Sequence, residues 1–266
     1  DRHGPDRFGR VRDRRLHVGR LDLLFDRRSK KLLRREAICE LMDSRFNPDQ
    51  VVLSRAGSQL AESQAALSQP IGELTETLHA RGRRGQPSEI ENLIGAAITE
   101  TLSERSIKVD AVIHGVLDEN ATLLAGPTRI SDVWNIIPYE NLIVTATLSP
   151  DEIKIMMEEV YASHQPRHLL GIAVRVERRG LDRRIISMTF PDGRQLERDK
   201  RYVIAVNSFD ARSGGHHFMK LRALLDRPES NWVLHPVQTR DAVIDYFRRH
   251  KVVKRIAATT PLGMAA

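Results

Sequence analysis

The side chains that most often hold catalytic metal ions are scattered along this sequence. Two metal ions about 4 Å apart need clustered carboxylates and imidazoles. Neither N-H-[DE] nor G-H-x-H occurs, and the D-x-H match of Asp1-Arg2-His3 stands alone. Of the ten histidines only His216 and His217 are adjacent, and Cys39 is the single cysteine, which excludes an intramolecular disulfide and a cysteine-based zinc site. We therefore expect no metal site and no metal-dependent catalytic centre within these residues.

A basic segment accounts for the whole net charge of +7. Residues 1–36 hold thirteen Lys and Arg against six Asp and Glu, whereas the other 230 residues hold 29 of each. Such a segment suits an anionic surface, an acidic protein partner or a nucleic acid. Its interleaved aspartates favour a solvated arginine-rich surface over a dedicated nucleic-acid site. These alternatives stay open.

Composition places the chain among folded proteins. Its 266 residues allow one large domain or two small ones, and a hydrophobic content of 41% supports a core. No run of eighteen apolar residues is present, so the sequence predicts no transmembrane segment. No export signal is visible either.

Strands and helices alternate irregularly, which predicts a mixed α/β fold. A hairpin is expected from strands at 16–26 and 31–43, followed by a connecting helix over 47–68 with Asn47 as N-cap and Pro48 in the first position. A second hairpin is expected to run from 185–190 through the turn Pro191-Asp192-Gly193 to a return strand at Arg194. The other expected strands are 110–114, 142–148 and 202–207, and the other expected helices are 90–102, 149–162, 217–225 and 239–249.

Three segments share their order and spacing with a known family. Residues 126–141 read GPTRISDVWNIIPYEN, residues 202–209 read YVIAVNSF and precede SGGHHF at 213–218, and Asn92-Leu-Ile lies five residues before Ala97. Together they resemble the 5′-nucleotidase C-terminal domain family over roughly residues 66–256. The resemblance implies a mixed sheet packed with helices, preceded by the hairpin and the connecting helix.

The same resemblance implies a division of the chain. Residues 18–23, VGRLDL, are similar to the last strand of the family's metallophosphatase domain. Residues 1–46 would then be a basic arm with the terminal strands of a truncated metallophosphatase-like domain, and residues 47–69 the connecting helix. Residues 70–258 would form the 5′-nucleotidase C-terminal-like domain, and 259–266 a tail.

In the family, the N-terminal domain holds two divalent metal ions and hydrolyses a nucleotide phosphate ester, while the C-terminal domain stacks the base between two aromatic rings. The resemblance implies Tyr139 and Phe209 as those rings, although either could instead be a half-buried packing residue. The other implied contacts to substrate are Asn120, Asn141, Gly214, Gly215 and His216. Gly214 and Gly215 would let the backbone turn sharply beside a ligand.

This sequence departs from the family at three places. Asn120 stands where the family has an arginine, with Asp118 and Glu119 beside it, and His216 stands where the family has an aspartate. The stretch from Phe209 to Gly214 is one residue longer than usual. An anionic ligand would therefore lose its bidentate partner.

Two functions follow from the resemblance. The first is the nucleoside- or nucleotide-binding C-terminal portion of a 5′-nucleotidase-family hydrolase of nucleotide catabolism, inactive by itself. The alternative is a degenerate member that serves as a non-catalytic binding or structural subunit. The resemblance also implies a periplasmic or extracellular location.

Overall fold

The computed structural model describes residues 17–82, 86–163, 167–179 and 182–257. These residues divide into two compact units, one ending at Ser63 and the other beginning at Gln64. The division falls within helix α1 (Gln50–Leu67), so it does not decide between the boundaries inferred from the sequence. Those boundaries stay predictions. Within the described residues, no helix combines the length and apolar character needed to cross a bilayer.

The first unit contains the expected hairpin. Strands β1 (His17–Phe25) and β2 (Leu32–Leu41) pair antiparallel. Gly19 pairs with Cys39 and Leu21 with Ala37 on one face, because alternate residues of a strand point the same way. Each pair on the opposite face contains at least one charged residue, as in Asp22 with Glu36. The more apolar face, which carries Leu21 and Leu23, is left exposed within this unit.

Helix α1 begins later than expected. The Asp49 carboxylate accepts hydrogen bonds from the amides of Val51 and Val52, at 2.8 and 3.0 Å. The prediction of Asn47 as N-cap and Pro48 as the first helical residue was wrong, because a second capping residue follows them and binds the free amides. No residue of α1 is fully buried, as expected for a connecting helix.

The second unit is built on a five-stranded mixed sheet in the order β13-β8-β12-β5-β9. Strands β5 (Ala111–His114) and β12 (Tyr202–Asn207) are parallel, and the other neighbours are antiparallel. The remaining strands are β8 (Leu142–Leu148), β9 (His168–Leu170) and β13 (Val233–Gln238). This arrangement confirms the mixed α/β fold.

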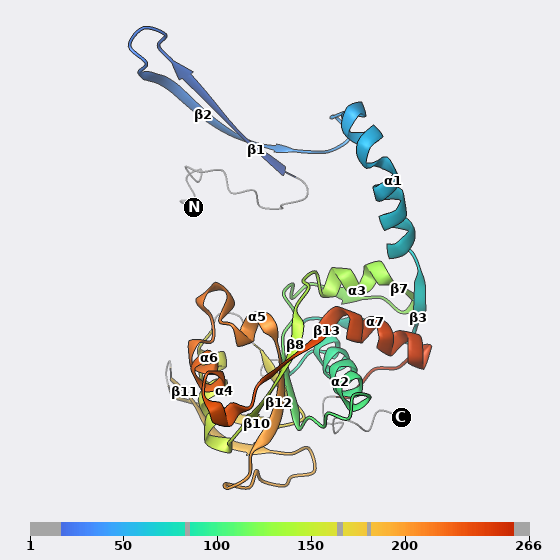
Figure 1. Cartoon of the computed structure of the whole chain (residues 1–266), viewed down its shortest axis with the longest axis vertical. Coiled ribbons are helices and arrows are strands. Elements are labelled where there is room, and N and C mark those ends of the chain that lie inside the picture. The colour runs from blue at the N-terminus through green and yellow to red at the C-terminus, as the bar shows by residue number, and fades with distance from the viewer. Residues whose placement is uncertain (1–16, 83–85, 164–166, 180–181, 258–266) are drawn as a thin grey trace. The chain divides into compact units, whose positions relative to one another are not determined.

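Helices cover both faces of this sheet (Figure 1). One face packs against α2 (Glu89–Ser103) and α7 (Thr239–His250), which lie side by side. The other face packs against α4 (Pro150–Ala162) and α6 (Met219–Leu225). Successive residues of a strand point to opposite faces of the sheet. In β5, Val112 therefore faces the core beneath α2 and α7, and Ile113 faces the core beneath α4 and α6.

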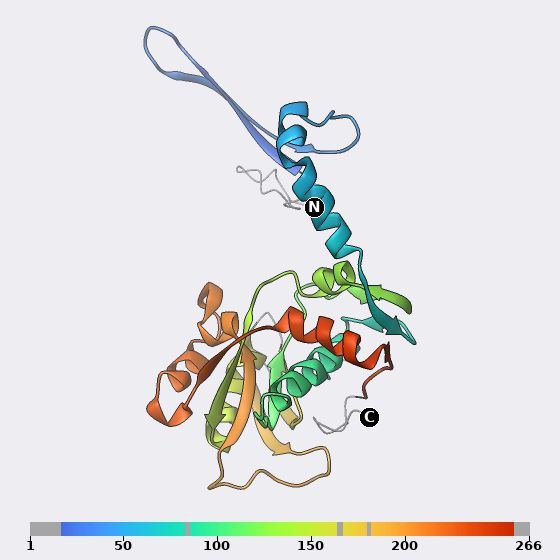
Figure 2. The ribbon, with the colours of Figure 1, turned by 45° about the vertical axis from the view of Figure 1, so that its right-hand side comes forward.

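Smaller elements flank these three layers (Figure 2). Strands β14 (Val252–Val253), β3 (Pro70–Leu74) and β7 (Gly126–Arg129) form one sheet, and β4 (Leu78–His79) pairs with β6 (Thr122–Leu123). The short helices are α3 (Ile130–Ile136), α5 (Ser208–Ala211), η1 (Gly214–His216) and η2 (Pro228–Ser230).

The second hairpin differs from its prediction. Strand β11 (Asp182–Thr189) pairs with the preceding strand β10 (Ala173–Arg179), not with a strand after the turn. The turn itself forms, because Gly193 N donates to Phe190 O and Phe190 N donates to Arg194 O. Beyond it, the described pairing is a single bridge between Thr189 and Gln195. A strong turn signal therefore indicated the wrong partner strand.

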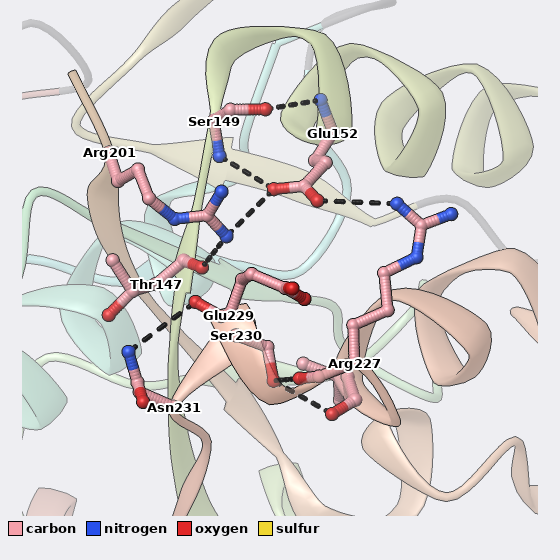
Figure 3. Close-up of polar contacts among 9 residues, drawn as sticks. Thr147, Ser149, Glu152, Arg201, Arg227, Glu229, Ser230 and Asn231 are labelled. Atoms are coloured by element: carbon pink, nitrogen blue, oxygen red, sulfur yellow. Dashed lines mark hydrogen bonds and ion pairs between the residues drawn. The ribbon is translucent and has the colours of Figure 1, made fainter. Parts of the chain in front are cut away.

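Glu152 joins three segments at one end of the sheet (Figure 3). Its side chain accepts from Ser149 N at 2.9 Å, while Ser149 Oγ accepts from Glu152 N, forming a capping box at the start of α4. The same carboxylate lies 2.9 Å from Arg201 Nη2 and 3.4 Å from Arg227 Nη1. Glu152 lies in the first turn of α4, after the C-terminal end of β8. The site described next lies at the other end of that strand.

Candidate ligand site at the sheet edge

The carboxyl ends of the two parallel strands define one edge of the sheet. Parallel strands end at the same edge, so His114 at the end of β5 and Asn207 at the end of β12 lie there together. Strand β9 runs the other way and places His168 opposite His114. Ligands of α/β proteins commonly bind outside this edge.

A buried ion pair links helix α5 to the residue before β9. The Asp210 carboxylate lies 3.0 Å from Arg167 Nε, with side chains only 2% and 11% exposed respectively. Asn207 holds this carboxylate in place, since its Nδ2 donates to Asp210 Oδ2 at 2.7 Å and its Oδ1 accepts from Asp210 N. Asn207 is thus the N-cap of α5, which fixes the helix that carries Phe209.

Two histidines and a glutamate extend this polar cluster. His168 Nδ1 lies 3.0 Å from the buried carboxylate of Glu91, which also accepts from Ser88 N in the capping box of α2. His114 is buried, and its Nδ1 has no hydrogen-bond partner among the described residues. Burial lowers the pKa of His114 to about 4, and Arg167 contributes in the same direction, against the carboxylates of Asp210 and Glu91. His114 is therefore a neutral imidazole near neutral pH.

Phe209 presents an aromatic ring at this edge. Its side chain is 44% exposed, and the ring packs against Gly214, where a Cβ atom would lie only 2.3 Å from two ring carbons. Gly214 is required here by close approach. The structure thus brings Phe209 and Gly214 together, although the intervening stretch is longer than the family spacing.

The segment after Phe209 is tightly wound. Ser213, Gly215, His216 and Phe218 all have positive φ angles between 54° and 66°. The Ser213 hydroxyl donates to Phe218 O at 3.3 Å. Left-handed conformations at non-glycine residues are sparsely populated. Gly215 and His216 both lie exposed on this turn.

Tyr139 lies in the loop between α3 and β8, with half its side chain exposed (52%). The main chain just after Tyr139 forms hydrogen bonds with two other segments. Asn141 O accepts from Thr239 N at 2.9 Å, and Leu142 N donates to Ser208 Oγ at 3.1 Å. The second bond joins the first residue of β8, directly after this loop, to α5, the helix of Phe209. Tyr139 and Phe209 therefore belong to segments that one hydrogen bond joins.

Asn120 occupies a different local setting. It lies exposed in the turn before β6, where its amide donates to Asp118 Oδ1. Its side-chain oxygen accepts from Arg81 Nη2 at 3.1 Å, and Arg81 also lies 4.0 Å from Glu119. Within the described residues its hydrogen bonds are to Asp118, Arg81 and Thr122, and none is to the other predicted residues.

The described side chains do not fit a pair of metal ions. Among the described residues, no group of three or more His, Cys, Asp and Glu is arranged to hold a metal. Glu91 and His168 bind each other, and Asp210 binds Arg167.

Sequence reasoning missed the buried polar cluster. Arg167 and His168 are neighbours in the sequence, but Glu91 and Asp210 come from two other segments, and only the pairing of β9 with β5 brings the first two to the edge. One local signal was available: Asn207 precedes Asp210 by three residues, the spacing of an N-cap and its partner.

A scan against protein families matches residues 70–223 to the model described as 5′-nucleotidase, C-terminal domain. The match covers more than half of the chain. The chain belongs to this family. The expected family and fold are thereby confirmed, whereas binding and activity are separate questions. Among curated proteins no sequence matches.

Solved structures give the same fold. A 5′-nucleotidase precursor from Thermus thermophilus aligns with a TM-score of 0.62 at 20% identity, over 91% of this chain and 48% of that one. A protein described as a putative 5′-nucleotidase, from Staphylococcus aureus in complex with α-ketoglutarate, gives 0.63 at 17%, over 94% and 49%. The NAD nucleotidase of Haemophilus influenzae gives 0.59 at 14%, over 91% and 52%. The chain thus spans about half the length of these relatives.

Proposed function

We propose that this chain is the nucleoside-binding C-terminal portion of a 5′-nucleotidase-family hydrolase that acts in nucleotide catabolism. One observation carries the proposal: the exposed rings of Phe209 and Tyr139 come from segments joined by the Leu142–Ser208 hydrogen bond at the carboxyl edge of the sheet. An aromatic face stacks on any base and contributes roughly 1–3 kcal/mol. Asn141, Gly214, Gly215 and His216 border these rings in sequence and are proposed to contact the sugar or the base edge.

The charges favour a nucleoside over a nucleotide. Arg167 is paired with Asp210, and Arg81 is held by Asn120 close to Glu119. Asp118 and Glu119 add exposed negative charge to the turn of Asn120. A phosphate near Arg167 or Arg81 would meet a cation that already has a partner, and it would lose the bidentate arginine of the family.

A thermal-shift series tests this ligand class. Adenosine, guanosine, cytidine and uridine, each compared with ribose and with the matching monophosphate, should raise the melting temperature of the intact chain. The monophosphates should raise it no more than the nucleosides do. Tyr139→Ala should reduce the shift, whereas Trp232→Ala, which removes another exposed aromatic residue (45%), should preserve it. A shift by monophosphates alone would contradict the proposed preference.

The alternative is a degenerate member that acts as a non-catalytic binding or structural subunit. The replacement of the family's aspartate by the exposed His216, and of its arginine by Asn120, favours this reading. No thermal shift with any nucleoside, together with retained folding, would support it. Binding of a nucleoside that requires Tyr139 would exclude a purely structural role.

We further propose that the hairpin and the basic segment belong to a metallophosphatase-like domain that holds two divalent metal ions in the whole protein. The apolar face of the hairpin, which includes Leu21 (62% exposed), supports this, because apolar surfaces of that kind are usually covered. Deleting residues 1–46 should then reduce concentration-dependent self-association in light scattering. Equal self-association of the intact chain and the chain without residues 1–46 would contradict the proposal.

If the apolar face of the hairpin stays uncovered in the whole protein, the basic residues 1–36 would instead bind an anionic surface or an acidic partner. Salt-dependent binding to anionic vesicles or to nucleic acid, lost on the same deletion, would reveal that role. By family resemblance we place the whole protein in the periplasm or outside the cell. Fractionation of cells that express the whole protein tests this placement, and a purely cytoplasmic signal would contradict it.

A further inference from the structure

Arg240 is a buried cation next to the loop of Tyr139. It is the second residue of α7, and its side chain is only 5% exposed. The guanidinium carbon lies 3.5 Å from the centroid of the Trp134 ring, which belongs to α3. Helices α3 and α7 lie against each other in both views (Figures 1 and 2).

The polar contacts of Arg240 are incomplete. Nη2 donates to Gln238 Oε1 at 2.9 Å and lies 3.6 Å from Glu140 Oε1. Nε and Nη1 are buried without a hydrogen-bond partner among the described residues. Leaving donors unpaired in the interior is unfavourable, and an apolar side chain of similar volume is often as stable or more so. The stack on Trp134 offsets part of this cost, but the two unpaired donors leave Arg240 with little net advantage in folding stability over an apolar side chain.

What Arg240 does contact is the loop between α3 and β8. Trp134 lies in the helix before the loop, and Glu140 lies inside it. Gln238, which Arg240 binds, is the strand partner of Leu142 just after the loop. The neighbouring Thr239 amide donates to Asn141 O. The first turn of α7 thus touches the chain before, within and after the loop.

We propose that Arg240 is a positioning residue that holds the loop of residues 137–141, and with it Tyr139, in a fixed place for ligand stacking. The proposal rests on the proposed function. The Tyr139 ring is half exposed and gains little from its own packing, so its position depends on the loop backbone. A loop ordered in advance lowers the entropy lost on binding. Arg240 supplies that order through Glu140 on one side and Trp134 on the other.

The test compares Arg240→Met with Arg249→Met in the intact chain. Methionine keeps a long apolar stem against Trp134 but removes the contact with Glu140. Arg249 is a control on the same helix, paired with Glu100 and Glu104 near its far end. Three quantities are measured for each variant: the melting temperature, hydrogen exchange at the Thr239 and Leu142 amides, and the affinity for adenosine.

Arg240→Met should leave the melting temperature unchanged or higher. It should speed exchange at both amides about tenfold, because the acceptor of the Thr239 amide, Asn141 O, lies in the loosened loop and the Leu142 amide directly follows it. It should weaken adenosine binding about fivefold or more. Arg240→Lys, which keeps a cation near Glu140 without the flat stack on Trp134, should fall between Arg240→Met and the unmodified chain. Arg249→Met should leave exchange at these amides and adenosine affinity unchanged.

Unchanged exchange at both amides in Arg240→Met would overturn the proposal, whatever the chain binds. So would faster exchange accompanied by unchanged adenosine affinity. If the unmodified chain binds no nucleoside, the proposed function fails, and the exchange data still decide whether Arg240 orders the loop. If Arg240→Met does not fold, Arg240→Lys carries the same comparison.

Discussion

Replacing His114 with asparagine should make the folding stability of the second unit less dependent on pH. Burial lowers the pKa of His114 to about 4 in the folded chain, from an ordinary value of 6.5. The unfolded chain therefore takes up a proton at this residue while the folded chain does not. Stability is fully present above pH 6.5, falls as the pH is lowered towards 4, and changes no further below that.

The size of the effect follows from the two pKa values. A shift of one unit corresponds to about 1.4 kcal/mol, so the full displacement of His114 is worth about 3 kcal/mol. At about pH 5, roughly 2 kcal/mol of this is already lost relative to about pH 7.5. Most carboxylates are still ionised at that pH, which keeps other contributions small.

Urea denaturation followed by tryptophan fluorescence measures this, because both tryptophans, Trp134 and Trp232, lie in the second unit. The loss of unfolding free energy between about pH 7.5 and 5 should be roughly 2 kcal/mol smaller in His114→Asn than in the unmodified chain. His235→Gln serves as a comparison, since burial also lowers the pKa of His235. The reasoning would be refuted by equal pH dependence of the unmodified chain and His114→Asn.

Three further outcomes are expected. Gly214→Ala places a Cβ atom 2.3 Å from the Phe209 ring and should weaken nucleoside binding about fivefold to a hundredfold in calorimetry. Gly57→Ala, where a Cβ meets nothing within 4 Å, is the control. Equal nucleoside affinities of Gly214→Ala and the unmodified chain would exclude a role for the ring. Glu152→Gln should lower the unfolding free energy by about 1–2 kcal/mol in urea, because it weakens the capping box and two ion pairs, while adenosine affinity stays unchanged. Asp151→Asn, on the exposed side of the same turn, should change the stability less, and a larger effect there would contradict the role of Glu152. With added divalent metal, the intact chain should release no phosphate from AMP above a protein-free blank in a phosphate assay, and clear release would show a catalytic centre that the described residues do not reveal.

Sequence reasoning recovered the elements whose signals are local. The hairpin of β1 and β2, the capping box that opens α4 at Ser149 and the β-branched strand β8 all form within a few residues of the predicted bounds. It failed where a nearby signal competed or where the partner lay far away. Asp49 replaced Asn47 as the cap of α1, and β11 paired with β10, which carries no distinctive signal.

For the candidate site, the sequence identified residues but not their setting. Phe209 and Gly214 do meet, because their separation is short enough for direct packing. The ion pair of Arg167 and Asp210 spans 43 residues, and the stack of Arg240 on Trp134 joins two distant helices. Such contacts follow from strand order and helix packing, which no local pattern in one sequence encodes.

The central claim is that Tyr139 and Phe209 together form a stacking site for a nucleoside base. Isothermal titration of adenosine into the intact chain, Tyr139→Ala, Phe209→Ala and the control Trp232→Ala tests it most directly. The account predicts that each of the first two variants weakens binding about fivefold or more and that Trp232→Ala binds like the unmodified chain. Adenosine binding that survives both substitutions unchanged, or no measurable binding by the intact chain, would contradict the claim.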